Sequence, residues 1–122
     1  MMRLIMFIVV FTTITGCTEL QLGNSFYASS LALESVDWGQ TRSIAKNPNR
    51  WTEMNPVLSA HPTVNQIDAY FPILITTTAI SYPFLKPAAR PWVYGWLTAI
   101  EAICVVNNAR HGIHMDFVAL KF

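Results

Sequence analysis

The sequence predicts an all-α fold, a small membrane helical bundle with three helices after a signal peptide, of which the last two form a transmembrane hairpin. Hydrophobic residues make up 52% of the 122-residue chain and charged residues 12%, whereas soluble domains typically contain about 25% charged residues. Two apolar stretches, 67–85 and 91–109, approach the length of about 20 residues that a helix needs to cross a bilayer core. The net charge of +1 offers no basic face for nucleic acid.

The N-terminus has the features of a bacterial lipoprotein signal peptide. Arg3 precedes an apolar run over 4–11, which is too short to cross a membrane and fits the hydrophobic region of a secretory signal. The ending "ITGC" resembles the lipobox, in which small residues precede a cysteine whose thiol carries a diacylglyceryl group. We therefore expect a signal peptide at 1–16 and lipidation of Cys17. The alternative is an uncleaved helix over 4–22.

The residues after Cys17 are predicted to form a tether (17–28) followed by a single helical membrane domain (29–122). The first helix is expected over 29–46, and it ends where Pro48 restricts the preceding residue to extended geometry. Its apolar residues do not form a clean stripe, so we expect this helix to be in contact on more than one side.

The last two helices have clearer start and stop signals. Thr63 and Gln66 form a capping-box pattern before a helix expected over 64–82, kinked near Pro72 and stopped before Pro83. After the basic turn 86–91, the last helix begins at Pro91 and ends at a Gly112 C-cap. An aromatic cluster at its start is typical of a membrane interface, and its members are Trp92, Tyr94 and Trp96.

Glu101 lies near the middle of the last helix, where a carboxylate within a bilayer is costly unless it is paired or neutralised. Cys104, Asn108 and His111 share its helix face. Possible partners are Asp37 with Thr41, Arg42, or Arg110, and a protonated Glu101 bonded to Asn108 or a threonine is equally allowed. Glu101 is then either part of a hydrogen-bonded clamp between helices or part of a proton, ion or small-ligand site.

A second polar constellation combines "DWGQT" (37–41) with "EMNP" (53–56). This D-x-x-x-T … E-x-N-P pattern resembles one in small bacterial and phage membrane proteins of two or three helices. The matching positions are Asp37, Thr41, Glu53, Asn55 and Pro56. The resemblance implies a helical membrane domain, a phage or prophage origin and no established activity. Together with Glu101 and Asn108, the first four of these residues form the polar cluster that we expect within the membrane.

Other kinds of chemistry have little support in the sequence. The stretch "HGIHMD" (111–116) suggests a metal site, but Gly112 is expected to break the helix between the two histidines, so they would not share a face. Ser59 and His61 are close together without an orienting acid nearby, which argues against a nucleophilic pair. We expect no cofactor and no metal.

These observations predict a small membrane lipoprotein with a non-enzymatic role, exerted by contact in the bacterial envelope. Its partners would be membrane lipid through Cys17, and an envelope protein or a second copy of the chain. For a phage protein, that role would be host-envelope modification, exclusion or assistance in lysis. The expected location is the inner membrane, with the N-terminus on the periplasmic side. Two alternatives are a membrane-embedded enzyme or transport component using the polar cluster, and a holin-like pore former.

Overall fold

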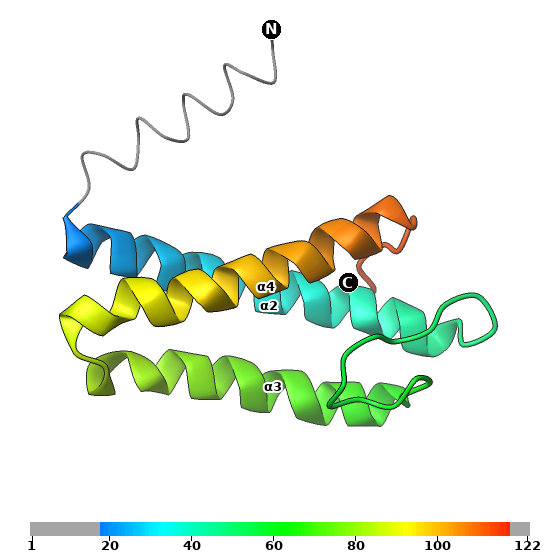
Figure 1. Cartoon of the computed structure of the whole chain (residues 1–122). Coiled ribbons are helices and arrows are strands. Elements are labelled where there is room, and N and C mark those ends of the chain that lie inside the picture. Colours follow the sequence, from blue (N-terminus) through cyan, green and yellow to red (C-terminus); the bar gives the residue numbers. More distant parts are fainter. Residues whose placement is uncertain (1–17, 118–122) are drawn as a thin grey trace, which may run out of the picture.

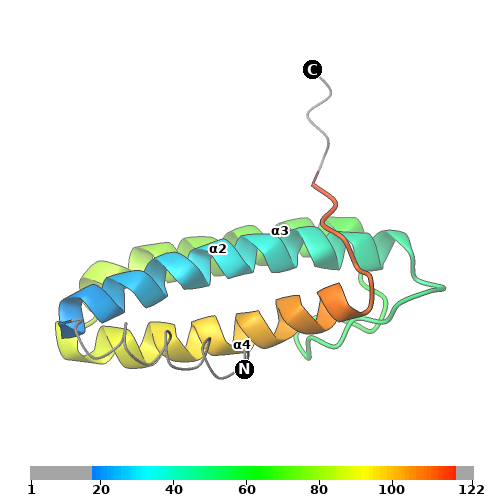
Figure 2. The same cartoon turned by 90° about the horizontal axis from the view of Figure 1, so that it is seen from above.

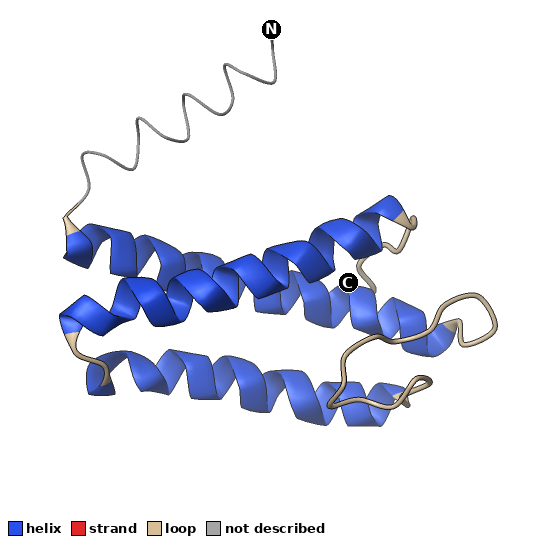
Figure 3. Ribbon diagram, viewed as in Figure 1, coloured by secondary structure: helices blue, strands red, loops and turns tan. Residues whose placement is uncertain are grey.

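Three α-helices make up most of the part of the chain that the structure describes. This computed structural model describes residues 18–117, and its elements are α2 (Glu19–Lys46), α3 (Val64–Ser81), η1 (Tyr82–Phe84), η2 (Pro87–Ala89) and α4 (Arg90–Arg110). Residues 18–117 contain no strand, so the predicted all-α fold with three helices is confirmed for them (Figure 3). The signal peptide predicted at 1–16 and the lipidation site Cys17 lie outside the described residues.

The helix α2 is the element against which the other two helices pack. It contacts both α3 and α4, and its contact with α4 is the more extensive. The three helices lie side by side along their lengths (Figures 1 and 2). At one end, which we call the turn end, η1 and η2 join α3 to α4 close to the start of α2 (Figure 1). At the other end, which we call the loop end, residues 47–63 join α2 to α3.

The helix α2 begins at Glu19, so the tether predicted at 17–28 is wrong for residues 19–28. Thr18 caps the helix: its hydroxyl accepts from the Gln21 backbone N–H, and the Gln21 side chain accepts from the Thr18 backbone N–H. Tertiary contacts stabilise the following turns. The Tyr27 ring packs 4.6 Å from the Tyr82 ring centroid, and the Tyr27 hydroxyl donates to the Ala79 carbonyl at 3.2 Å.

The helices α3 and α4 begin and end within two residues of the predicted positions. Thr63 and Gln66 form the predicted capping box, and α3 continues through Pro72 to Ser81. At the end of α4, Gly112 has a φ of +73°, which is the left-handed conformation that glycine adopts readily. The Ile113 N–H donates to the Asn108 carbonyl at 3.0 Å across this turn, so Gly112 acts as the predicted C-cap.

The interior of the bundle mixes polar and apolar side chains, and large apolar side chains also lie on its surface. Among the described residues, the buried polar side chains are Ser30, Glu34, Asp37, Gln40, Thr41, Arg42 and Thr78, and the buried apolar ones are Ile44, Ile67, Phe71, Tyr94 and Ile113. Large apolar side chains lie exposed on α3 and α4, including Ile73, Ile80, Trp92, Trp96, Ile103 and Val106. Contiguous exposed apolar surface on a protein marks a place where something else binds.

The predicted transmembrane hairpin is not confirmed. Within residues 18–117, no helix has both the length and the hydropathy of a membrane span. The physical reason lies in the composition of the two stretches. Three consecutive threonines (76–78) interrupt the apolar residues of α3, and Glu101, Asn107 and Asn108 lower the hydropathy of α4.

The residues after α4 fold back against the C-terminal part of α2. The Asp116 N–H donates to the Gly39 carbonyl at 2.9 Å, and Arg42 Nε donates to the Asp116 carbonyl at 2.9 Å. Gly39 has to be small because a Cβ at this position would lie 2.9 Å from the Phe117 ring. This return places the buried side chain of Ile113 against the loop end, where it helps to line a cavity.

Candidate functional site

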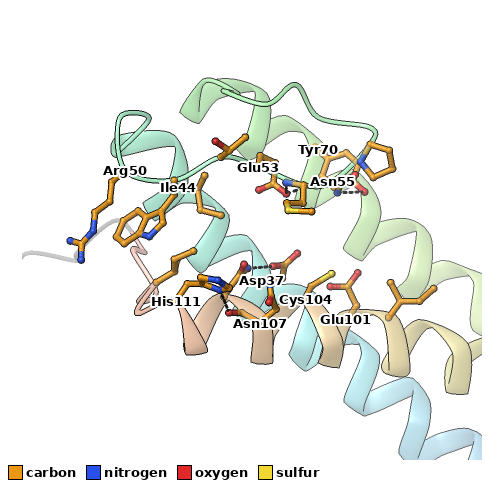
Figure 4. A pocket seen from close by; sticks show the side chains of 17 residues that line it. Asp37, Ile44, Arg50, Glu53, Asn55, Tyr70, Glu101, Cys104, Asn107 and His111 are labelled. Carbon is orange, nitrogen blue, oxygen red and sulfur yellow. Dashed lines mark hydrogen bonds between the residues drawn. The ribbon is translucent and has the colours of Figure 1, made fainter.

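A cavity of about 420 Å³ lies at the loop end of the bundle. Four segments line it: α2, the loop after α2, α3 through Tyr70, and the second half of α4 with the residues that follow (Figure 4). Five of the six residues predicted to form a polar cluster line this cavity, and they are Asp37, Glu53, Asn55, Glu101 and Asn108. The structure thus brings together side chains that are up to 71 residues apart in the chain.

Asp37 contributes the most deeply buried carboxyl group of the cavity. The residue is 8% exposed, and Asn108 Nδ2 donates to its Oδ1 at 3.1 Å. Burial raises the pKa of Asp37 to about 7, and the nearby negative charge of Glu53 adds to the increase. The hydrogen bonds from Asn108 and Thr41 oppose this shift, because they stabilise the charged form. Asp37 therefore exchanges its proton near neutral pH.

Thr41 is the sixth member of the predicted cluster, and it does not line the cavity. It lies one turn after Asp37 on α2 and is almost completely buried. Its hydroxyl stabilises the Asp37 carboxylate from behind, away from the open space. The D-x-x-x-T spacing therefore has a local explanation, because residues four apart on a helix lie on the same face.

Glu101 faces the same cavity from α4. Burial raises its pKa to about 7, and the negative charges of Asp37 and Glu34 increase the pKa further. Its Oε2 atom is buried and has no hydrogen-bond partner. The predicted hydrogen-bonded clamp between helices is therefore incomplete, because one oxygen of the Glu101 carboxyl group has no partner. Two of its suggested partners do not neutralise it, because Arg42 pairs with Asp68 and Arg110 is exposed.

The E-x-N-P stretch (53–56) forms a loop that borders the cavity and is held by hydrogen bonds between its own residues. Glu53 Oε1 accepts from the backbone N–H groups of Met54 at 2.9 Å and Asn55 at 2.7 Å. The Asn55 side chain accepts from the Val57 N–H and donates to the Tyr70 hydroxyl at 3.2 Å, which ties the loop to α3. Glu53 Oε2 stays buried and without a partner. One carboxylate oxygen therefore shapes the loop, and the other lies unpaired within the structure.

Cys104 and His111 complete the α4 side of the cavity. Burial raises the pKa of the Cys104 thiol, and the charges of Asp37, Glu101 and Glu53 raise it further. Because a thiol with a raised pKa is a poor nucleophile, the cavity lacks an activated cysteine. His111 Nδ1 lies 2.8 Å from the Asn107 carbonyl. Residues 18–117 hold no group of three or more side chains placed to ligate a metal.

Sequence reasoning missed Glu34, which is the most deeply buried acidic residue that the structure describes. It is fully buried, and its Oε1 accepts from the Thr78 hydroxyl at 2.8 Å, while its Oε2 has no partner. Burial raises the pKa of Glu34, against the effect of the Thr78 hydrogen bond. A signal was present in the sequence: four polar residues follow one face of α2 at helical spacing, namely Ser30, Glu34, Asp37 and Thr41.

The pair formed by Arg42 and Asp68 was also missed. Arg42 is 5% exposed and forms a salt bridge with Asp68, which also accepts from Trp38 Nε1 at 2.9 Å. The hydrogen bond from Arg42 lowers the pKa of Asp68. This pair joins α2 to α3 outside the cavity, so the buried cation of the bundle is not available to the cavity carboxylates.

No family model matches this chain, and neither a curated protein nor a solved structure matches it. The resemblance to small bacterial and phage membrane proteins therefore stays a prediction. Its two motifs do have structural explanations: Asp37 and Thr41 form one hydrogen-bonded face of α2, and Glu53 with Asn55 organises the loop after it.

Proposed function

We propose that this protein is a small bacterial envelope protein, anchored by lipid at Cys17, that acts by contact with another envelope protein and without catalysing a reaction. The observation that carries the proposal is the set of large apolar side chains that lie exposed on α3 and α4, while several polar and charged side chains are buried inside the described bundle. A surface of this kind is costly in water, and burial of each large side chain against a partner is worth about 1.5–3 kcal/mol.

The turn end of the bundle supports the anchored orientation. The chain enters α2 there, directly after Cys17, and the same end carries the exposed aromatic side chains Phe84 and Trp92, which are 83% and 74% exposed. Lys86 lies exposed in the turn between α3 and α4, and Arg90 begins α4 with its guanidinium against the Tyr82 ring. Aromatic and basic side chains together suit the interface between water and an anionic membrane. A lipid on Cys17 would hold this end against the bilayer.

The side of α4 beyond this end supports contact with a partner protein. Trp96 and Ile103 are 68% and 70% exposed, and they lie on one face of the helix at i, i+7 spacing together with Ile100. A stripe at this spacing is the feature by which amphipathic helices pack against one another. We propose that a helix of an inner-membrane protein covers this stripe on the periplasmic side.

The anchor is tested by the intact mass of the protein purified from bacterial membranes, compared with the variant Cys17→Ser. We expect a species that begins at residue 17 and carries acyl chains, and we expect the variant to lose both the modification and firm membrane attachment. An unmodified full-length mass for both proteins would overturn the anchored orientation and favour the uncleaved helix over 4–22.

The contact is tested by placing a photo-crosslinking amino acid at Ile103 in cells, with Asn65 as the matched exposed control on α3. We expect one crosslinked protein adduct from position 103 and none from position 65, and we expect Trp96→Ser to reduce its yield. An adduct of twice the chain mass, or crosslinks to lipid only, would contradict the proposed protein partner.

A further inference from the structure

The cavity at the loop end contains three carboxyl groups without a compensating cation. Asp37 comes from α2, Glu53 from the loop and Glu101 from α4, and all three line the space (Figure 4). Arg42 is paired with Asp68 outside the cavity. Arg50 lines the rim, where its guanidinium lies 4.6 Å from the Trp51 ring centroid and is directed away from the three carboxyl groups (Figure 4).

The buried polar atoms of the cavity that lack a hydrogen-bond partner are carboxylate oxygens, which are acceptors. Glu53 Oε2 and Glu101 Oε2 are both fully buried atoms that accept no hydrogen bond, and Asp37 is more than nine-tenths buried. Buried carboxylate oxygens without a partner are costly, so a natural protein seldom retains them unless something satisfies them. A group with several N–H donors and a positive charge matches this set.

The rest of the cavity lining defines the ligand further. No described cluster of acidic, cysteine or histidine side chains is arranged to ligate a metal ion, so a bare divalent cation does not suit the site. An ammonium or guanidinium group has diverging donors that reach carboxylates on different elements. Ile44, Trp51 and Ile113 supply an apolar wall for an attached alkyl chain. A volume of about 420 Å³ lies within the usual range for small-molecule sites.

We propose that this cavity binds an organic cation, whose ammonium or guanidinium group bonds to Asp37, Glu53 and Glu101 while its alkyl part lies against the apolar wall. The site is distinct from the membrane anchor, because it lies at the opposite end of the bundle from the start of α2. Its three carboxyl groups are not part of the stripe on α4, with which the cavity shares the side chain of Ile100. A free small molecule and a basic side chain of a partner protein both carry this chemistry.

The experiment is calorimetric titration of the purified full-length protein at pH 8 with n-butylguanidinium and n-butylammonium, with butyrate as the anionic control. We expect saturable binding of one cation per chain and no binding of butyrate. Glu101→Gln and Glu53→Gln keep the shape of each side chain and remove its charge, so each is expected to weaken binding about tenfold or more. Glu19→Gln removes an exposed carboxylate at the other end and is expected to leave binding unchanged.

Circular dichroism on each variant distinguishes loss of cation binding from loss of the folded structure. A blocked peptide with one arginine, acetyl-Gly-Arg-Gly-amide, distinguishes a partner protein from a small molecule as the source of the cation. If the peptide binds more tightly than n-butylguanidinium, the cation belongs to a partner protein. If it binds more weakly, the cation belongs to a small molecule. Absence of saturable binding by any of these cations to the folded protein would overturn the proposal. So would equal binding by the wild type and a folded Glu101→Gln variant.

Discussion

At the residue scale, the bundle is unusual because its interior holds more acid than base. The negative charges of Asp37 and Glu34 raise the pKa of Glu101, and the buried cation, Arg42, pairs with Asp68. Glu34 and Glu101 each keep a buried carboxylate oxygen that has no hydrogen-bond partner in return for its lost hydration. The polar interior therefore reduces the stability of the protein at neutral pH, and its presence favours a binding role over a purely structural one.

Glu101→Gln is expected to stabilise the protein at pH 8. The pKa of Glu101 is raised from 4.5 to about 7 in the folded chain, so the stability associated with its neutral form is fully present below pH 4.5. That stability is lost as the pH rises through about 7. The amide cannot lose a proton, so we expect its free energy of unfolding to exceed that of the wild type by about 1–3 kcal/mol at pH 8.

Urea unfolding at pH 4 and pH 8 tests this expectation. The advantage of Glu101→Gln should disappear at pH 4, where the wild-type side chain is also neutral. Glu19→Gln serves as the control, because Glu19 is exposed at the start of α2. A Glu101→Gln variant that is less stable than the wild type at both pH values would show that the carboxylate is satisfied in the folded protein.

Arg42→Ala is expected to destabilise the bundle by about 1.5–3 kcal/mol, because the change leaves Asp68 without its cationic partner and removes a buried side chain. It also removes the hydrogen bond from Arg42 Nε to the Asp116 carbonyl. Arg50→Ala is the matched control, and it should change stability by less than about 0.5 kcal/mol because Arg50 is exposed. Thermal unfolding at pH 7 compares the three proteins, and equal midpoints would contradict a structural role for the pair.

At the element scale, each helix begins with a local signal or a tertiary contact that can be identified. The capping boxes at Thr18 and Thr63 satisfy the first backbone N–H groups of α2 and α3. The helix α4 has no such side-chain cap and begins instead with Arg90 and Pro91 directly after η2. A close approach holds α2 to that start: a Cβ on Gly23 would lie 3.1 Å from the Arg90 Cβ.

Thr63→Ala is expected to lower the free energy of unfolding by about 0.5–2 kcal/mol, which is the usual cost of losing an N-cap side chain. The reason is that the Gln66 N–H loses its acceptor, the Thr63 hydroxyl. Thr76→Ala is the control within the same helix, since Thr76 is exposed and makes no cap. Chemical denaturation of both variants is the measurement, and an equal effect of the two changes would argue against the cap.

At the scale of the whole molecule, the side chains that favour association with other molecules differ from those that stabilise the fold. Exposed side chains such as Trp96 and Ile103 contribute little to the fold, because they are outside the packed bundle. The same side chains supply apolar area that favours association in water. Changes on this surface should therefore alter what the protein associates with and leave the folded state intact.

The double variant Trp96→Ser/Ile103→Ser is expected to reduce association with the proposed envelope protein in detergent extracts while changing the free energy of unfolding by less than about 1 kcal/mol. Sedimentation velocity measures the association, and circular dichroism with heating measures the stability. Phe71→Ala is the contrasting variant, because Phe71 is 1% exposed and its truncation should cost about 3–5 kcal/mol. Loss of folding in the surface variant would show that these side chains belong to the core.

The sequence by itself determined the helices that depend on local signals. The capping box at Thr63, the breaks at Pro48 and Gly112, and the turn around Pro87 act over a few residues, so the bounds of α3 and α4 were predictable. The first turns of α2 also carry a local signal, the capping box of Thr18 and Gln21, which the predicted tether overlooked, and the contacts of Tyr27 with Ala79 and Tyr82 add to it. The tertiary structure decided which side chains are buried.

The same division holds for the candidate site. The helical spacing of Asp37 and Thr41 and the turn chemistry of Glu53 and Asn55 are local, and the sequence indicated these residues. Their meeting with Glu101 in one cavity depends on how α4 crosses α2. The pairing of Arg42 with Asp68 instead of Glu101 depends on how α3 packs against α2. Hydrogen bonds and propensities within a helix extend over about four residues. Burial and charge compensation depend instead on residues that are distant in the chain, and only the packed structure brings those together.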